Sequence, residues 1–114
     1  KGEISMNTID YKSYETQFGG VPEETEIDKL IKMLNAQGVC CPIDWKVKEL
    51  YGRPQVIFLN PQSEERIGDA VCHFGSYGHE KGLIEVMGFP FCDEEDVVGF
   101  LTADEVIHQI EVCC

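Results

Sequence analysis

Four consecutive apolar residues, Val56 to Leu59, constrain the fold of this chain more than any other stretch. Branched and aromatic side chains suit a pleated surface, and an unbroken run of them is typical of a strand that is buried on both faces. We therefore expect a central strand over Gln55–Asn60. The turn chemistry of Pro61 and its polar neighbours should then reverse the chain into a second strand over Arg66–Phe74.

Side chains alternate along a strand, so the two faces of this second strand should differ. One face should be small and apolar and the other mixed, with Gly68, Ala70, Cys72 and Phe74 on the first and Ile67, Asp69, Val71 and His73 on the second. A third strand is expected over Pro42–Leu50, where Ile43, Trp45 and Val47 alternate with polar residues. The three strands should form an antiparallel meander with Gln55–Asn60 in the middle.

The clearest helix pattern covers Glu23–Gln37. Pro22 precedes it, acidic residues fill its first turn, and Gly38 follows it. Its apolar stripe should pack on the sheet, the only large apolar surface available, through Ile27, Leu30, Ile31 and Leu34.

A second and shorter helix is expected over Lys81–Met87. Leu83, Ile84 and Met87 have helical spacing there, and Gly88 would close the helix. The pattern comes after a glycine-rich loop, Gly75–His79.

The last helix is marked by its capping chemistry. Thr102 and Glu105 have the spacing of a capping box, and Leu101 and Val106 are placed as the accompanying hydrophobic staple. Val97–Leu101 should lead into this helix. It should begin at Ala103 and bury an apolar side made of Val106, Ile107, Ile110 and Val112.

These elements predict an α+β domain over residues 22–114, in which a three-stranded antiparallel meander packs against an amphipathic helix and a C-terminal helix, with one further short helix. A chain of 114 residues fits one domain of this kind. Residues 1–21 should form an N-terminal arm or short helix. Its aromatic stripe is expected to cover the edge of the domain rather than to meet a partner, and consists of Tyr11, Tyr14 and Phe18.

Nine basic and 21 acidic residues give a net charge of −12. This charge repels nucleic-acid phosphates and anionic membrane surfaces, so we expect no direct nucleic-acid binding and no membrane binding. No apolar run is long enough to span a bilayer, and the amino terminus lacks a secretory pattern, which favours a cytoplasmic protein. The acidity indicates either a solvated surface or a basic partner.

Six cysteines occur, but Cys40–Cys41 and Cys113–Cys114 are adjacent pairs. There is no CxxC motif, and the spacing matches no zinc site. We expect reduced cysteines, no metal and no cofactor.

Ser76, His79 and Asp69 come nearest to a nucleophile, a base and an orienting acid. Ser76 does not stand in a G-x-S-x-G motif. Cys72, the other candidate nucleophile, cannot pair with the adjacent His73 on a strand, because neighbouring side chains point to opposite faces. A small hydrolase or thiol enzyme is therefore the less favoured alternative, and no catalytic residue is assigned.

Tyr77 is an aromatic residue on a glycine-rich loop, a position typical of an anchor for a protein partner. Spaced acidic residues should complete the partner-binding set, namely Glu64, Glu65, Glu94, Glu95 and Asp96. If these residues and Glu23–Glu26 formed one continuous face, the chain would mimic nucleic acid and inhibit a basic host nuclease or DNA-binding protein.

The motifs Ser76–Gly78, Gly82–Gly88 and Val98–Val106 follow one another in an order that resembles small acidic proteins of Gram-positive phages and mobile elements. The resemblance covers about Pro54–Ile110. We associate that group with no settled activity, so it assigns no residue a role. We expect a non-catalytic, acidic protein-binding module with a basic protein partner, such as an accessory or counter-defence protein of a phage.

Overall fold

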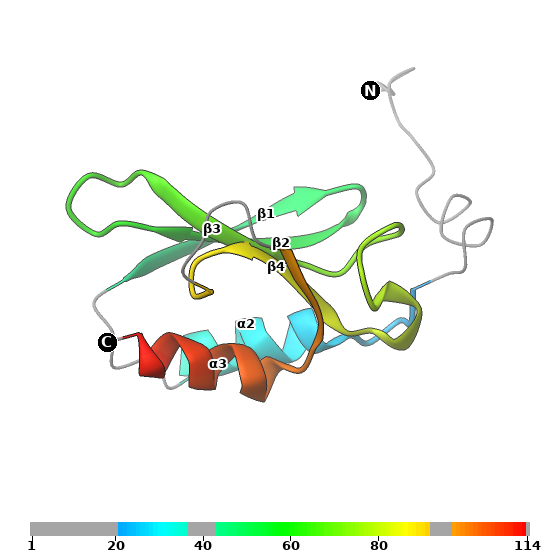
Figure 1. The fold of residues 1–114 in the computed structure, drawn as a ribbon. Helices are drawn as coiled ribbons and strands as arrows, with labels where there is room; N and C mark the ends of the chain where they lie inside the picture. Colours follow the sequence, from blue (N-terminus) through cyan, green and yellow to red (C-terminus); the bar gives the residue numbers. More distant parts are fainter. Residues whose placement is uncertain (1–20, 37–42, 92–96, 114) are drawn as a thin grey trace, which may run out of the picture.

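A computed structural model of the chain describes residues 21–36, 43–91 and 97–113. Within these ranges the elements are, in order, α2 (Glu26–Ala36), β1 (Asp44–Leu50), β2 (Arg53–Leu59), β3 (Arg66–Val71), the 3-10 helix η1 (His79–Lys81), β4 (Ile84–Gly88), β5 (Val97–Leu101) and α3 (Ala103–Val112), as Figure 1 shows. The strands form one antiparallel sheet in the order β1-β2-β3-β4-β5. The α+β class and the meander of β1, β2 and β3 are confirmed. The predicted N-terminal arm with Tyr11, Tyr14 and Phe18 lies outside the described residues.

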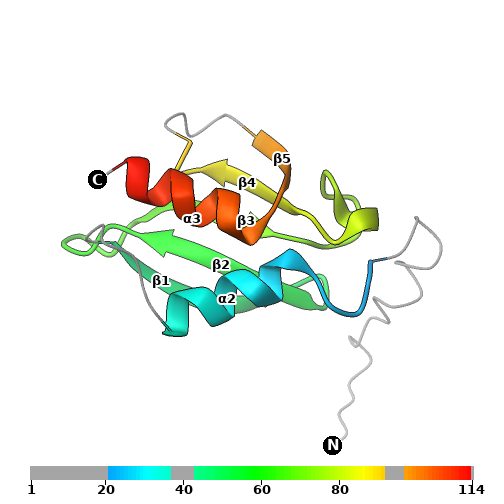
Figure 2. The same ribbon diagram turned by 90° about the horizontal axis from the view of Figure 1, so that it is seen from below.

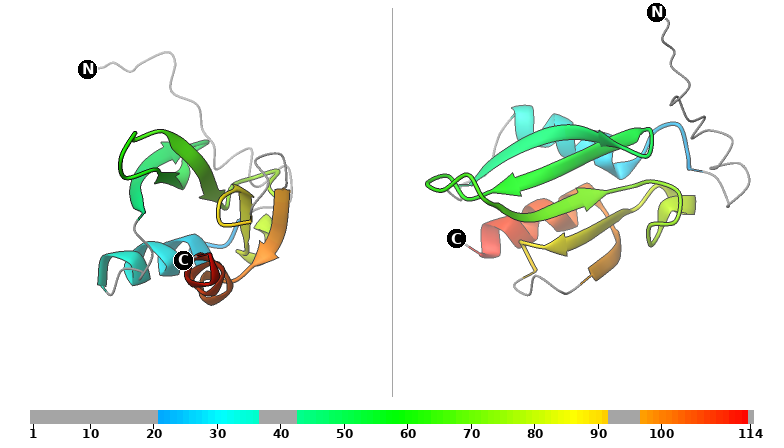
Figure 3. Two further views of the ribbon diagram at one scale, coloured as in Figure 1. Left: turned by 60° about the vertical axis from the view of Figure 1, so that its left-hand side comes forward. Right: turned by 90° about the horizontal axis from the view of Figure 1, so that it is seen from above.

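Both helices cover the same face of the sheet and run side by side, with their first turns at the same end of the molecule (Figures 1 and 2). The sheet twists above this helix layer, as the two views of Figure 3 show. The core fills the space between the layers, where Val56 and Phe58 of β2 are fully buried with Ile27 and Leu30 of α2. The predicted apolar stripe of the first helix is therefore on the sheet, as expected.

The start of α2 lies at Glu26, three residues later than predicted. Asp28 Oδ2 accepts hydrogen bonds from the backbone N–H of Thr25 at 3.0 Å and from the Thr25 hydroxyl at 3.3 Å. The carbonyl of Thr25 in turn accepts from the N–H of Asp28 at 3.1 Å and of Lys29 at 3.4 Å. These local contacts hold Thr25 at the boundary, so side-chain capping sets the start of the helix rather than Pro22.

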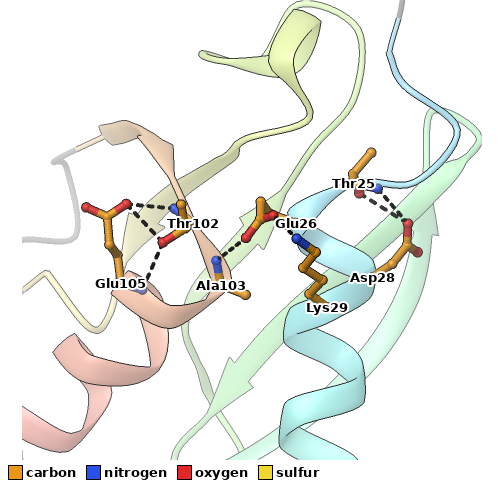
Figure 4. A network of polar contacts seen from close by, with 7 residues as sticks. All are labelled: Thr25, Glu26, Asp28, Lys29, Thr102, Ala103 and Glu105. Atoms are coloured by element: carbon orange, nitrogen blue, oxygen red, sulfur yellow. Dashed lines mark hydrogen bonds and ion pairs between the residues drawn. The ribbon is translucent and has the colours of Figure 1, made fainter.

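The start of α3 is confirmed at Ala103. The Thr102 hydroxyl accepts from the backbone N–H of Glu105 at 3.2 Å, and Glu105 Oε1 accepts from the N–H of Thr102 at 2.8 Å. This is the predicted capping box (Figure 4). Leu101 and Val106, the predicted staple, are both buried in the core.

The prediction of a short helix over Lys81–Met87 is wrong. A 3-10 turn ends at Lys81, and β4 follows at Ile84. Along β4 Ile84 and Val86 are fully buried while Met87 is exposed, which is the alternation of a strand. Three apolar residues in a short window fit either periodicity, and the pairing of β4 with β3 and β5 decides between them.

Val97–Leu101, expected only to lead into the last helix, is the fifth strand. It pairs with β4 through Met87 opposite Val97 and Val86 opposite Val98. The register shifts between this pair and the pair of Ile84 with Leu101, so the pairing is irregular over Gly99 and Phe100.

The predicted faces of β1 and β3 need two corrections. A register shift at Phe58 and Leu59 turns Ile67 toward the helix-side core, so Ile67 does not share a face with Asp69. On β1, Trp45 packs against the core as expected, but Val47 is 46% exposed because this edge strand reaches beyond the helix layer.

A single carboxylate joins the first turns of the two helices. Glu26 Oε1 accepts from the backbone N–H of Ala103 at 2.9 Å, and Glu26 Oε2 forms an ion pair with Lys29 Nζ at 2.8 Å (Figure 4). A helix leaves its first N–H groups without partners inside the helix, so a carboxylate there is favourable. Burial acts to raise the pKa of Glu26, but the hydrogen bonds from Lys29 and Ala103 outweigh it and lower the pKa below its ordinary value.

The fully buried ring of Phe58 should account for much of the stability of the fold. We expect Phe58→Ala to lower the free energy of unfolding by about 3–5 kcal/mol, because it removes apolar contacts and leaves a cavity. Urea denaturation measures this loss. The control is Val112→Ala, which should change the value by less than about 0.5 kcal/mol, because Val112 is 60% exposed and not buried on α3 as predicted. A loss below about 1 kcal/mol for Phe58→Ala would contradict this core.

The lowered pKa of Glu26 makes stability depend on pH. Its ionised form stabilises the fold above the unfolded pKa, and this stabilisation is lost as the pH falls through the lower folded pKa. We expect Glu26→Gln to cost about 1 kcal/mol at pH 7 and progressively less at acidic pH. Urea denaturation from pH 3 to pH 7 tests this, with Glu49→Gln, at an exposed residue of β1, as the control. A cost that is the same at every pH would contradict the role of the ionised carboxylate.

Candidate functional site

The loop between β3 and β4 is held in a tight conformation by its own backbone. The Ser76 hydroxyl accepts from the N–H of His73 at 3.1 Å and donates to the carbonyl of His73 at 2.8 Å. Gly78 and Gly82 flank η1 with φ of 90° and 71°, values that glycine adopts at no steric cost. The carbonyl of Gly78 accepts from the N–H of Leu83 at 3.0 Å. The sequence of this loop therefore fixes the position of Tyr77, which lies between Ser76 and Gly78.

Tyr77 rests directly on β5. Its carbonyl accepts from the N–H of Phe100 at 3.4 Å, and its own N–H donates to Glu85 Oε1 on β4 at 2.9 Å. A Cβ atom added to Gly99 would stand 2.3 Å from the Tyr77 Cβ, closer than any side chain allows. Glycine at position 99 is thus required for Tyr77 to occupy this place.

The rings of Tyr77 and Phe100 are both directed to solvent. Each residue is 59% exposed, and both line a depression of about 320 Å³ formed by Gly75 to Lys81 and Phe100. Phe100 has φ of 59°. This left-handed conformation is a genuine outlier for a bulky residue and costs on the order of 1–3 kcal/mol.

Two further apolar side chains extend this surface along the sheet. Met87 and Val97 are 42% and 39% exposed and lie directly opposite each other on β4 and β5. Directly opposed residues share a face, and here it is the face away from the buried Val86 and the helices. Four of the seven exposed large apolar residues in the described part of the chain thus lie on or against β4 and β5. We call Tyr77, Met87, Val97 and Phe100 the Tyr77 surface.

The end of the molecule that carries Tyr77 is acidic. The N–H of Glu26 donates to the carbonyl of Gly82 at 2.8 Å, so the loop lies at the first turns of both helices. Those first turns contain Glu26, Asp28, Asp104 and Glu105. Negative charge is favourable at helix N-termini, which explains its presence there without any partner. Next to Tyr77 itself, the charged residues are two acids and one base, namely Glu80, Glu85 and Lys81.

Basic side chains gather elsewhere. Lys46 and Lys48 stand opposite Ile57 and Gln55 on the outer face of β1 and β2, and Arg66 forms an ion pair with Asp69 at 3.1 Å on the same face. Arg66 is distant from Lys46 and Lys48 in the sequence, but the three residues lie on one face of the neighbouring strands.

Of the other acidic residues predicted to bind a partner, the two that the structure describes do not adjoin Tyr77. Glu64 and Glu65 lie in the turn between β2 and β3, where the N–H of Glu64 donates to the carbonyl of Asn60 at 2.7 Å. That turn and the start of α2 are at opposite ends of the molecule (Figures 1 and 3). Glu94, Glu95 and Asp96 lie outside the described residues.

The three residues considered for catalysis have separate structural roles. Ser76 is only 3% exposed, and its hydroxyl closes the turn at His73. The ring Nδ1 of His79 lies 2.7 Å from the carbonyl oxygen of Ser76. Asp69 Oδ2 accepts from Gln55 Nε2 at 2.7 Å and pairs with Arg66. These contacts place the Ser76 hydroxyl in a structural turn rather than at a base.

The alternative nucleophile, Cys72, lies in the core and is fully buried. A substrate would have to displace core side chains to reach its sulfur. His73, its neighbour, stacks edge-on against Tyr51 with ring centroids 5.0 Å apart. Among the residues that the structure describes, no group of three or more His, Cys, Asp and Glu side chains is placed to hold a metal ion.

Comparison of the chain with protein-family models, with curated proteins and with solved structures finds no match. The resemblance to phage proteins stays a prediction. Within the described ranges, no helix has the length and apolar character needed to cross a membrane.

Substitution of Phe100 tests whether its left-handed backbone conformation is strained. We expect Phe100→Asn to leave the free energy of unfolding unchanged or to raise it by up to about 1 kcal/mol, because asparagine tolerates the left-handed conformation. The same substitution at Phe91, which packs against the core, should cost about 1–3 kcal/mol. Urea denaturation of both variants measures the difference. Equal losses at the two positions would show that the Phe100 ring stabilises the fold and is not strained.

Proposed function

We propose that this chain is a non-catalytic protein-binding module that holds a basic segment of a partner protein on the Tyr77 surface. The single observation that carries the proposal is the pair of exposed rings, Tyr77 and Phe100, on a backbone that is tightly held at one residue and strained at the other. Strained conformations persist where the surrounding structure imposes them, and they cluster at functional sites. Exposed aromatic residues in a group are typical of protein-binding surfaces.

The chemistry of the partner follows from the charge. The chain carries a net charge of −12, and the first-turn acids of both helices lie at the end that carries Tyr77. Complementary potentials speed association and select partners, so a basic segment with apolar side chains fits this surface best. The resemblance to proteins of phages makes a bacterial host protein the natural partner in this proposal.

The described geometry supports this function better than the alternatives. Nucleic-acid mimicry needs acidic residues on one continuous face, whereas Glu64 and Glu65 are at the far end of the molecule from Glu23, Glu24 and Glu26. A hydrolase or thiol enzyme needs an accessible nucleophile, whereas Ser76 and Cys72 are buried.

A displayed library of random peptides, selected against the whole chain, tests the proposal. We expect the selected peptides to carry net positive charge and apolar side chains, and their affinity to fall as the salt concentration rises. Tyr77→Ala and Phe100→Asn should each weaken binding at least about tenfold in fluorescence anisotropy, which corresponds to about 1.4 kcal/mol.

Two controls separate loss of the surface from loss of the fold. Phe100→Asn is expected to keep its stability, so weaker binding by this variant is not unfolding. Val112→Ala alters an exposed apolar residue on the last turn of α3 and should bind normally. Selection of no peptide, selection of acidic peptides, or equal binding by the Tyr77→Ala variant would overturn the proposal.

A further inference from the structure

We infer that the partner segment binds as an extended strand added along the outer edge of β5, an inference that rests on the proposed function and specifies its geometry. β5 is at one end of the strand order, and among the described residues no strand pairs with its outer edge. An edge of this kind presents backbone N–H and C=O groups that a strand from another chain can bind.

The two edges of the sheet differ in a way that favours β5. β1, at the opposite edge, contains four charged residues among seven, Asp44, Lys46, Lys48 and Glu49. Charged side chains on an edge oppose pairing with other chains. β5 has the sequence VVGFL and contains no charged residue. The edge that carries the Tyr77 surface is therefore the one without charged side chains to oppose an added strand.

Two depressions adjoin the end of β5, at the successive residues Phe100 and Leu101, which suits the alternation of an added strand. Phe100 lines the depression of about 320 Å³. Beside α3 lies a second depression of about 330 Å³, whose lining includes Leu101, Asp104, Glu105 and His108. Successive side chains of a strand point to opposite faces, so alternate residues of the segment would reach one depression or the other.

The two depressions differ in chemistry, and this specifies the segment. The first presents the rings of Tyr77 and Phe100 and suits an apolar or aromatic side chain. The second combines the apolar side chains of Phe91 and Leu101 with the carboxylates of Asp104 and Glu105, so it suits lysine or arginine, which have an apolar stem and a charged head. The occupant is thus an extended peptide in which apolar and basic residues alternate. Because the N–H of Phe100 already donates to Tyr77, backbone pairing is confined to Val97–Gly99 and the side chains must supply most of the specificity.

The test uses the tightest peptide from the library and two versions of it with backbone N-methyl groups. Each version is methylated at every second residue, in opposite registers, so the side chains and charges are unchanged. Strand addition predicts that one register weakens binding more than tenfold and the other by less than threefold, because only alternate N–H groups face the edge. The amides of Val97–Gly99 should also become protected from hydrogen exchange when the unmodified peptide binds.

Variants of the chain test the second depression. Asp104→Asn should weaken binding of the peptide about three- to tenfold and reduce its dependence on salt, whereas Glu111→Gln, at the other end of α3, should not. If the two methylated registers weaken binding equally and the amides of Val97–Gly99 are not protected, strand addition is overturned. The proposed function would still stand in that case if binding required Tyr77. Failure to obtain any Tyr77-dependent peptide would instead overturn the proposed function itself.

Discussion

Burial of one face of the sheet beneath α2 and α3 is the constraint on which the rest of the structure depends. Val56, Phe58 and Val86 must point to the helices, and this fixes the direction of every neighbouring side chain through the alternation of the strands. Met87 and Val97 are exposed because they lie on the face of the sheet opposite to the helices. The packing of the core thus determines which side chains form the outer surface of the sheet, and these side chains are available for a function.

The arrangement of the helices explains why an acidic end and an aromatic surface coincide. Because α2 and α3 begin at the same end, their favourable first-turn acids gather there, and Glu26 links the two first turns through the N–H of Ala103. The loop of Tyr77 is tied to that end by the bond between Glu26 and Gly82. Negative charge that stabilises the helices therefore lies at the same end of the molecule as the loop of Tyr77, and in the proposed function it would also favour a basic partner.

The sequence was sufficient for elements defined by local signals. The capping box of Thr102 and Glu105 marks the start of α3, the unbroken apolar run of Val56 to Leu59 predicts β2, and alternating patterns predict β1 and β3. The sequence was insufficient for β4 and β5, because the apolar pattern of a five-residue segment is compatible with a helix or a strand, and only pairing with neighbouring strands decides between them. Tyr77 was predictable from its glycine-rich loop. The sequence did not predict that three other exposed residues would lie near Tyr77, namely Met87, Val97 and Phe100, because the register of β4 with β5 brings them there. The one available signal was the uncharged run around Gly99.

The contact between Tyr77 and Gly99 can be measured directly in solution. Nuclear Overhauser spectroscopy of the whole chain should show strong cross-peaks between the Hβ protons of Tyr77 and the Hα protons of Gly99, together with strand cross-peaks between Met87 and Val97. Helical cross-peaks within Lys81–Met87 and no contact between Tyr77 and Gly99 would contradict the surface and everything inferred from it.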